Sequence, residues 1–455
     1  MSSESEVCVA IIGGGVAGLT LANILEQSSI SYILWESQDQ IAPPAGASIG
    51  LMPNGLRILD QIGVIDDVEE YKIPHDRWEH RDADGTLYHT VDAMRHFDEV
   101  LGYNGIFMER QRLLEILHNN IRDKSRIHTN KRVTSVENFP SHALVTATDG
   151  TQIRSAFVAG ADGVHSAVRR SIQALTPTAQ PPADYLTANY SCVYGISTPH
   201  PSLPPGRNYT IYRRTSSLLL FTAAGGILYW FIFQALPSPL PYGRAPRYTA
   251  ADVASAASAV AETVIKTPSS SSSSDAGETV RFADVFARKK TALMTALEEG
   301  VAAPHAWTTG RTALVGDAAH KMVPHAAMGA NQAMESAACF ANGVRALLAR
   351  GDDAAPRDWE AVEACLEAYK ERRVARVKGV VEAAAKACRV QLLVGEEARK
   401  WVEALPGMGY AEWLERTMEV FSKAEKVEGW EGGGERVRFY DEQARKWIEQ
   451  RAVGV

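Results

Sequence analysis

The stretch from residue 7 to residue 36 constrains the fold of this chain more than any other. An apolar run (VCVAII) is followed by the glycine turn GGGVAG, the helical pattern LTLANILEQ and a second apolar run (YILWE). Strand, turn, helix and strand in this order form a βαβ unit, which opens a sheet of parallel strands. We therefore predict an α/β fold that begins with a Rossmann-type domain.

The same stretch carries a dinucleotide-binding fingerprint. Gly13, Gly15 and Gly18 fit the pattern G-x-G-x-x-G between the strand and the helix. These glycines allow a tight turn, close approach of a pyrophosphate and close packing of the helix on the strand. Glu36 ends the next strand, where an acid binds the ribose hydroxyls of adenosine and disfavours the 2′-phosphate of NADP. The fingerprint predicts FAD or NAD and does not choose between them.

Composition narrows the class of protein. The 455 residues carry a formal charge of -7, which gives no electrostatic reason to expect nucleic acid as a partner. The five cysteines are scattered without a C-x-x-C pair, so we expect a reducing compartment and neither disulfides nor a zinc site. No basic leader precedes the first apolar run. We expect a cytoplasmic protein, with peripheral membrane contact left open.

One uncharged stretch, residues 217–236 (SLLLFTAAGGILYWFIFQAL), is long enough to cross a bilayer. Its central Gly225-Gly226 is a turn signal, and both flanks are rich in aromatic and branched residues. This pattern favours a buried β-hairpin. Stable membrane insertion is therefore not expected.

The local sequence pattern changes several times along the chain. Asp84-Gly85 and Asp149-Gly150 are hairpin turn signals, and the apolar spacing of residues 109–121 predicts a helix. The serine run 269–274 is expected to be a flexible surface insertion. We predict a Rossmann-type domain interleaved with a β-sheet substrate domain and followed by C-terminal helices. The boundaries are 1–75, 101–173 and 301–356 for the first domain, 76–100 and 174–300 for the second, and 357–455 for the helical region.

Two further glycine motifs follow the fingerprint in a specific order. GADGVHSAVR begins at Gly160 and GDAAHKMVPHAAMGANQA begins at Gly316, with the helix ERQRLLEIL before both. In this order the motifs resemble those of the class A FAD-dependent monooxygenases, the p-hydroxybenzoate hydroxylase-like family with a GR2-type FAD domain. The resemblance covers about residues 7–380. LMPNGLRILDQIG, ERQRLLEIL and the aromatic hairpin are most similar to fungal indole-diterpene and meroterpenoid flavin epoxidases.

The resemblance implies a set of FAD-binding residues. Gly13, Gly15, Gly18 and Glu36 would hold the ADP half, and Asp317 the ribityl hydroxyls. Arg110 would reach the phosphate-ribityl region, with Arg112 as its rival. The backbone at Gly329 and Ala330, at a helix start, would face the flavin ring. The remaining implied positions are Gly50, where the chain passes the flavin, and Asp162 in the second motif, which is linked to both FAD and NAD(P)H.

The family reaction reduces flavin with NAD(P)H, forms a flavin C4a-hydroperoxide with O2 and delivers one oxygen atom to a substrate. The resemblance implies epoxidation or hydroxylation of a small apolar natural product in secondary metabolism. Tyr212 lies where related enzymes carry a substrate-side tyrosine, and Tyr194 and Tyr229 compete with it for this role. A buried aromatic that only packs is the alternative for each.

Other interpretations stay open. A salicylate-type hydroxylase of a small acid would need a cation in the substrate domain, for which Arg213-Arg214 is the candidate. A non-catalytic flavin-binding partner protein is the alternative from another class. Asp317, His320 and His325 lack the spacing of a metal site, so no metal is expected. The oligomeric state is not predicted.

Overall fold

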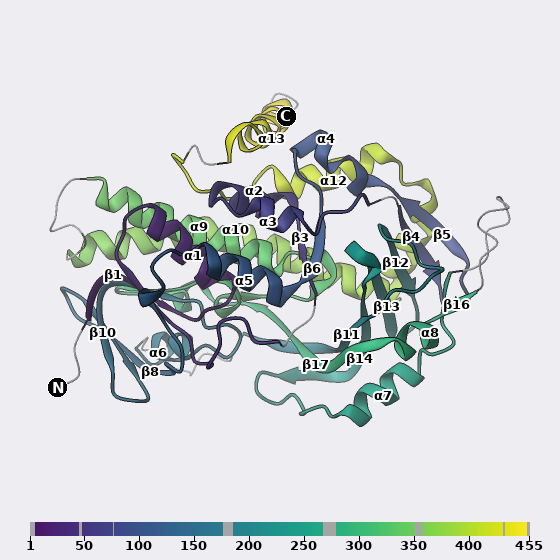
Figure 1. Cartoon of the computed structure of the whole chain (residues 1–455), viewed down its shortest axis with the longest axis horizontal. Helices are drawn as coiled ribbons and strands as arrows, with labels where there is room; N and C mark the ends of the chain where they lie inside the picture. Colours follow the sequence, from purple (N-terminus) through teal and green to yellow (C-terminus); the bar gives the residue numbers. More distant parts are fainter. Residues whose placement is uncertain are drawn as a thin grey trace.

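The computed structural model describes residues 5–44, 48–75, 77–175, 185–266, 279–350, 356, 358–430 and 433–452. Two large sheets lie side by side, and the long helices α9 (Gly329–Leu348) and α10 (Trp359–Gln391) run beside the first toward the second (Figure 1). The serine run 269–274 lies outside the described residues.

The first sheet is the predicted Rossmann-type sheet. Its strands lie in the order β18-β19-β10-β1-β2-β7. β1 (Ser5–Ile12) pairs in parallel with β2 (Tyr32–Trp35) and β10 (Gln152–Gly160), and β10 pairs in parallel with β19 (Thr312–Leu314). β8 (Val133–Asn138) and β9 (Ala143–Ala147) form a hairpin, and β9 also pairs with β10. The turn between β9 and β10 contains Asp149-Gly150, and Gly150 has a φ of +80°. β7 (Ile127–His128) and β18 (Thr308–Thr309) form the two ends.

Helix α1 (Val16–Gln27) completes the βαβ unit and is buried along most of its length. It packs against α5 (Arg110–Asn120) and α9, while the strand residues Val9, Ala10 and Ile11 are fully buried. A strand covered on both faces becomes a continuous apolar run, which is why VCVAII shows no alternation. The predicted α/β class and Rossmann-type fold are confirmed.

The second sheet is almost entirely antiparallel and has the order β20-β17-β11-β14-β13-β12-β4-β5. Its central strands are β11 (Thr187–Ser197), β12 (Arg207–Tyr212), β13 (Ser216–Thr222), β14 (Leu228–Pro241) and β17 (Lys289–Val301). The hairpin β4 (Arg77–Asp82) and β5 (Leu87–Val91), closed at Asp84-Gly85, joins one edge, and β20 (His320–Lys321) joins the other. The chain therefore enters this sheet in three separate segments. The domain boundaries remain predictions.

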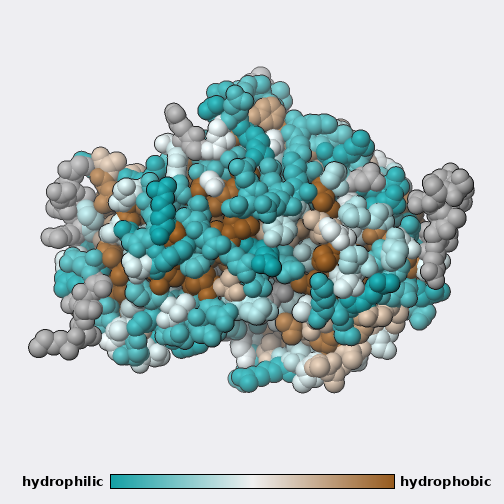
Figure 2. All heavy atoms as spheres, viewed as in Figure 1, coloured by the Kyte–Doolittle hydropathy of each residue, from teal (hydrophilic) through white to brown (hydrophobic). Residues whose placement is uncertain are grey.

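The uncharged stretch 217–236 forms the antiparallel pair β13 and β14, as predicted from its glycines. Gly225 and Gly226 turn the chain with φ angles of +66° and +72°. Among the described residues no helix is long and apolar enough to cross a membrane. In the view of Figure 2 hydrophobic residues appear in small groups among hydrophilic ones.

The two faces of this hairpin serve different cores. Leu218, Leu220, Trp230 and Ile232 pack on α7 (Ala250–Ser258) and α8 (Phe282–Ala287), two helices that the sequence pattern did not predict. Thr249 and Asp252 begin α7 with a capping box. The alternate residues of the hairpin face the first domain.

The chain after α10 folds into helices, as predicted: α11 (Gly395–Ala404), α12 (Tyr410–Phe421) and α13 (Gly434–Ala452). The segment between α12 and α13 is held by two side-chain amides. Gln61 of α2 (Pro53–Gln61) donates to the Val427 carbonyl at 2.8 Å and accepts from the Val427 N–H at 3.0 Å. Asn342 of α9 bonds in the same two-point way to the Lys426 carbonyl and the Glu428 N–H. α13 then packs on α2 (Figure 1).

The remaining elements are short. They are β3 (Ser48–Leu51), β6 (Ile106–Glu109), β15 (Val264–Lys266), β16 (Val280–Arg281), α3 (Ile65–Glu69), α4 (Phe97–Leu101) and α6 (Ala167–Leu175). β3 and β6 form a small antiparallel sheet of their own.

Candidate functional site

A cavity of about 500 Å³ lies between the glycine turn and the second sheet. One side is formed by Gly15, Val16, Ala17, Arg110, Ala161, Gly163, Asp317, Gly329 and Ala330 of the first domain, together with Lys321 of the edge strand β20, which pairs with Asp317. The other side is built from the second sheet by Cys192, Tyr194, Leu219, Phe221, Phe231, Phe233, Thr295 and Leu297. All the charged residues that line it belong to the first side.

The fingerprint glycines leave room for a ligand and for each other. A Cβ on Gly13, whose φ is +108°, would lie 2.4 Å from the Ala161 carbonyl oxygen. A Cβ on Gly18 would lie 1.9 Å from the Gly13 carbonyl oxygen. Gly15 is the N-cap residue of α1, and a Cβ on it would lie 3.9 Å from the Arg110 guanidinium. The turn is therefore a cradle with open backbone at a helix N-terminus, which suits a phosphate.

Glu36 lies at the end of β2 beside this turn. Its carboxylate accepts hydrogen bonds from the Gly14 N–H at 2.7 Å and the Gln38 N–H at 2.8 Å. Glu36 is half-buried and does not line the cavity. An adenosine ribose at Glu36 would therefore lie beyond the cavity, at the far end of the glycine turn.

The two candidate arginines point in different directions. Arg110 begins α5 and lines the cavity. Arg112 pairs with Glu115 at 2.6 Å and its side chain is 52% exposed. Positions two apart on a helix lie on opposite faces, because each residue turns the helix by about 100°. Arg110 is the arginine that the fold brings to the site.

Asp317 lies in the turn after β19 and lines the cavity together with Lys321. Their side chains form an ion pair at 2.7 Å. Burial acts to raise the pKa of Asp317, but the positive charges of Lys321 and Arg110 hold that pKa below its usual value. Asp317 is thus an acceptor for ligand hydroxyls at neutral pH. Lys321 was not predicted as a site residue, although it belongs to the same motif.

The first turn of α9 presents Gly329 and Ala330 to the cavity. Asn331 fixes this turn: its amide donates to the carbonyls of Gly50 and Ala327, and its oxygen accepts from the Met52 N–H. Gly50 of β3 lines the same cavity and has no room for a side chain, because a Cβ would lie 2.8 Å from the Ala327 Cβ. A polar residue on the buried face of a helix was the signal that could have identified Asn331 as a clamp.

Asp162 differs from the other candidates. Its neighbours Ala161 and Gly163 line the cavity, whereas its carboxylate accepts from the N–H groups of Ala167 and Val168 at the start of α6. Burial outweighs these bonds and raises the pKa of Asp162. Here Asp162 shapes the second glycine motif, and the backbone beside it borders the cavity.

Tyr212 is not brought to the site. It is 2% exposed, shares a 3.0 Å hydrogen bond with His80 Nδ1, and packs under the C-terminal residues Trp401 and Met408. The sheet register runs from Phe233, which lines the cavity, through Ser217 to Tyr212. Two strand spacings of about 4.8 Å separate Tyr212 from Phe233, and Ser217 between them does not line the cavity, which begins on β13 at Leu219.

Of the two rival tyrosines, Tyr194 lines the cavity and Tyr229 does not. Burial and the nearby Cys192 raise the pKa of Tyr194, and Arg110 opposes them. Its hydroxyl therefore stays protonated at neutral pH.

The arginine pair proposed for a carboxylated substrate lies elsewhere. Arg213 donates to Ser216 and Thr263 and reaches the Ala259 carbonyl on the α7 side of the second sheet. Arg213 and Arg214 line a separate pocket there. The substrate-facing side of the main cavity thus has no cationic side chain among the described residues.

The histidines of the third motif are buried. His320 bonds to Ser336 at 2.8 Å, and the His325 ring packs at a tilt against Phe233 with 4.0 Å between ring centroids. Burial lowers the pKa of both to about 3, so both are neutral. Among the described residues no group of three potential ligands could hold a metal ion.

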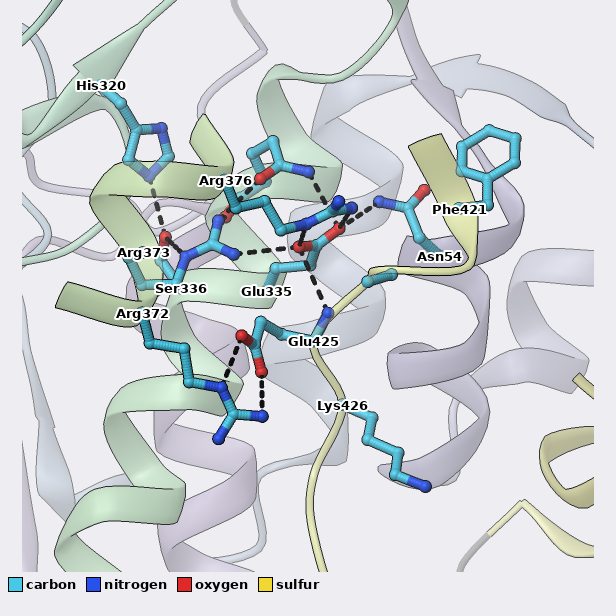
Figure 3. Close-up of polar contacts among 12 residues, drawn as sticks. Asn54, His320, Glu335, Ser336, Arg372, Arg373, Arg376, Phe421, Glu425 and Lys426 are labelled. Carbon is cyan, nitrogen blue, oxygen red and sulfur yellow. Dashed lines mark hydrogen bonds and ion pairs between the residues drawn. The ribbon is translucent and has the colours of Figure 1, made fainter. Parts of the chain in front are cut away.

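Behind the first turns of α9 lies a buried charge network (Figure 3). The Glu335 carboxylate accepts from Arg373 at 3.0 Å, from Arg376, and from Asn54 at 2.6 Å. The Glu425 N–H bonds to the same carboxylate, which brings in the C-terminal segment. Burial opposes ionisation, yet the two arginines lower the pKa of Glu335 to about 2. This network joins α2, α9, α10 and the C-terminal segment, and α9 also carries the cavity residues Gly329 and Ala330.

Comparison with known proteins places this geometry in a family. A family model described as an FAD binding domain matches residues 6–384. The chain belongs to this family. It is similar to the FAD-dependent monooxygenase ausM of Aspergillus calidoustus, with 35% identity over 84% of this chain and 80% of the relative. It is also similar to the FAD-dependent monooxygenase cdmI of Talaromyces verruculosus, with 32% identity over 98% of this chain and 92% of the relative.

Among solved structures, the fold is similar to Klebsiella pneumoniae HpxO complexed with FAD and uric acid. The TM-score is 0.72, with 23% identity over 92% of this chain and 97% of that one. The chain is an FAD-dependent monooxygenase and hence an oxidoreductase. The resemblance to the class A FAD-dependent monooxygenases, which was inferred from the order of the three glycine motifs, is confirmed.

Proposed function

We propose that this monooxygenase uses NAD(P)H and O2 to insert one oxygen atom into a small apolar natural product, as part of secondary metabolism. The reaction is epoxidation of a prenyl alkene or hydroxylation of an aromatic ring. Its setting is the cytoplasm. The fungal relatives named above support the reaction class, and the cavity supports the substrate class.

The observation that carries the substrate class is the asymmetry of the cavity. Arg110, Asp317 and Lys321 lie on the side of the glycine turn. The facing wall is aromatic and aliphatic, and its hydrogen-bonding side chains are Tyr194, Thr295 and the Cys192 thiol. A charged substrate would be left without a partner on that wall, at a cost of several kcal/mol.

The residues present fit FAD. The open cradle at Gly13, Gly15 and Gly18 would hold the pyrophosphate, and Glu36 the adenosine ribose. Arg110 would reach the phosphate-ribityl region and Asp317 the ribityl hydroxyls. The backbone of Gly50, Gly329 and Ala330 would border the ring, and Asp162 would support this arrangement through the turn that it caps. When bound, FAD supplies the redox chemistry that activates O2.

The protein's own contribution is orientation and exclusion of water. The N-terminus of α9, fixed by Asn331, offers N–H groups and a positive dipole end to a negatively charged ring. The wall formed by Leu219, Phe221 and Phe231 keeps water from the reacting atoms. Tyr194, protonated at neutral pH, is the group that we propose to donate a hydrogen bond on the substrate side, in place of Tyr212.

The salicylate-type alternative loses its main support. It requires a cation for the substrate carboxylate, and Arg213 is committed on the opposite side of the second sheet. A preference for small carboxylated rings over apolar alkenes would restore it.

The test combines spectroscopy and product identification. Purified protein should be yellow, and NADH or NADPH should bleach the flavin. Incubation with 18O2 and a panel of prenylated and aromatic compounds should give a product heavier by one labelled oxygen atom. A yellow protein whose flavin neither nicotinamide reduces would instead support the non-catalytic partner protein.

A further inference from the structure

A row of four side chains crosses the second sheet on its cavity face. Leu293 of β17 is paired with Tyr194 of β11, Tyr194 with Phe231 of β14, and Phe231 with Leu219 of β13. Cross-strand partners lie on the same face with their Cβ atoms about 5 Å apart. Tyr194, Phe231 and Leu219 line the cavity, and Leu293 continues the row outside it.

Exposure changes steadily along this row. Leu219 is 3% exposed and Phe231 8%, Tyr194 is half-buried, and Leu293 is 49% exposed. The row therefore runs from the interior of the cavity to solvent without a break.

The outer strand is open at this point. β17 lies next to the sheet edge, and its outer neighbour β20 pairs with it only at Gly300 and Val301. Thr295 and Leu297, on the same face as Leu293, line the cavity. The cavity wall thus reaches solvent along β17, and Leu293 is the next side chain outward.

The row has the dimensions and chemistry for an elongated apolar ligand. Neighbouring strands are about 4.8 Å apart, so four side chains on adjacent strands span about 14 Å. The row carries no charge, and its single polar atom is the Tyr194 hydroxyl. A single exposed leucine is ordinary on a protein surface. Its register with three cavity residues is what distinguishes Leu293.

We propose that Leu293 is the outer end of the substrate-binding row, and that the apolar tail of an elongated substrate lies across the strands from Leu219 to Leu293. This inference rests on the proposed function, because it assigns the substrate an apolar scaffold longer than the enclosed part of the cavity. The reacting end lies inside, beyond Tyr194, and the tail leaves the protein over the edge of β17. Leu293 thereby selects for length.

The experiment measures binding to the FAD-loaded protein. The ligands are prenyl alcohols of ten, fifteen and twenty carbons, and the readout is the change in flavin absorbance. The wild-type protein should bind more tightly as the chain lengthens. Leu293→Ser should weaken binding of the twenty-carbon alcohol by about fivefold, the value of covering the exposed half of a leucine, and leave the ten-carbon alcohol unchanged.

Leu87→Ser is the matched control. Leu87 is a similarly exposed leucine, at 46%, on β5 at the opposite end of the same sheet. It should change the affinity for none of the three alcohols. If Leu293→Ser keeps the wild-type length dependence, the row does not extend to Leu293. The same conclusion follows if Leu293→Ser alters only self-association or binding to phosphatidylcholine vesicles.

Failure of the underlying function gives a different result. In that case the wild-type protein retains FAD but binds none of the three alcohols, and the apolar substrate class fails together with the row. If the wild-type protein binds longer alcohols more tightly and Leu293→Ser leaves this dependence intact, only the extension of the row to Leu293 is refuted, and the apolar substrate class stands.

Discussion

Gly18 lies so close to Gly13 that a Cβ atom on Gly18 would be 1.9 Å from the Gly13 carbonyl oxygen. Helix α1 can approach β1 this closely only because the position has no side chain. The same contact determines how the helix N-terminus is presented to the cavity.

Gly18→Ala should therefore destabilise the protein by about 2 kcal/mol or more and reduce bound FAD, because the helix must move away from the strand. Gly379→Ala, at an exposed position of α10 away from the cavity, is the matched control, since a Cβ there meets nothing within 4 Å. Urea unfolding and the FAD content per chain measure both effects. Equal stability of the two variants would contradict this account of the glycine turn.

Asp317→Ala should lose FAD during purification, because it removes the acceptor proposed for the ribityl hydroxyls and leaves Lys321 without its partner. The dissociation constant for FAD should rise about tenfold or more, which corresponds to one or two lost charge-assisted hydrogen bonds. Asp149→Ala removes a comparable aspartate–lysine pair with Lys131, away from the cavity, and should bind FAD normally. Fluorescence titration of the apoprotein with FAD compares them.

Tyr194→Phe should bind FAD normally but release more hydrogen peroxide per NAD(P)H oxidised, because Tyr194 lines the cavity. Tyr212→Phe should leave this coupling unchanged and cost about 1 kcal/mol of stability, the value of its hydrogen bond with His80. The ratio of product to NAD(P)H separates the two tyrosines. The reverse outcome would return Tyr212 to the site.

Glu335→Gln should destabilise the protein by about 3–5 kcal/mol, because it leaves the buried charges of Arg373 and Arg376 without a carboxylate. Arg372→Gln breaks ion pairs at a side chain that is 48% exposed and should cost about 1 kcal/mol or less. Chemical unfolding of the two variants gives the comparison. A similar decrease in the free energy of unfolding of both variants would show that the buried network stabilises the protein no more than the exposed ion pairs do.

The buried histidines predict a pH dependence. Burial lowers the pKa of His80, His320 and His325 to about 3, whereas an unfolded histidine titrates near 6.5. As the pH falls below 6.5, these histidines bind protons in the unfolded state but stay neutral in the folded state. The free energy of unfolding therefore decreases progressively from pH 6.5 downward. Each histidine contributes about 1.4 kcal/mol per pH unit in that range. His325→Phe should reduce the slope of unfolding free energy between pH 6 and 5 by about that amount. An unchanged slope would mean that His325 is protonated in the folded protein.

Much of the fold followed from local patterns. The βαβ unit, the helix 109–121 and the hairpin in residues 217–236 each carry their own periodicity and turn residues, and these signals do not depend on the rest of the chain. The choice of Arg110 over Arg112 could also have been made from helix periodicity, since the two residues lie on opposite faces of α5.

Tyr212 could not be excluded from the sequence. It lies on the same face of the sheet as the cavity, as its alternation with Ile211 allows, but the strand order β11-β14-β13-β12 is not the order in the chain. Its distance from the cavity depends on that order and on the cover supplied by Trp401 and Met408. Long-range strand pairing leaves no local signal. For Asn331 the sequence offered a polar residue on a buried helix as a signal, but it did not reveal the partners Gly50 and Met52, which are far away in sequence.

The place of β1 in its sheet has a consequence for how the protein is made. β1 leaves the ribosome before its sheet neighbours β2 and β10, and β10 pairs in turn with β19 at residues 312–314. The Glu335 charge is satisfied only when Arg373, Arg376 and Glu425 have been synthesised. The glycine turn is therefore translated long before the segments that complete its surroundings. The nascent chain must be kept from aggregating until residue 425 has emerged, and we expect cofactor capture only after that point of translation.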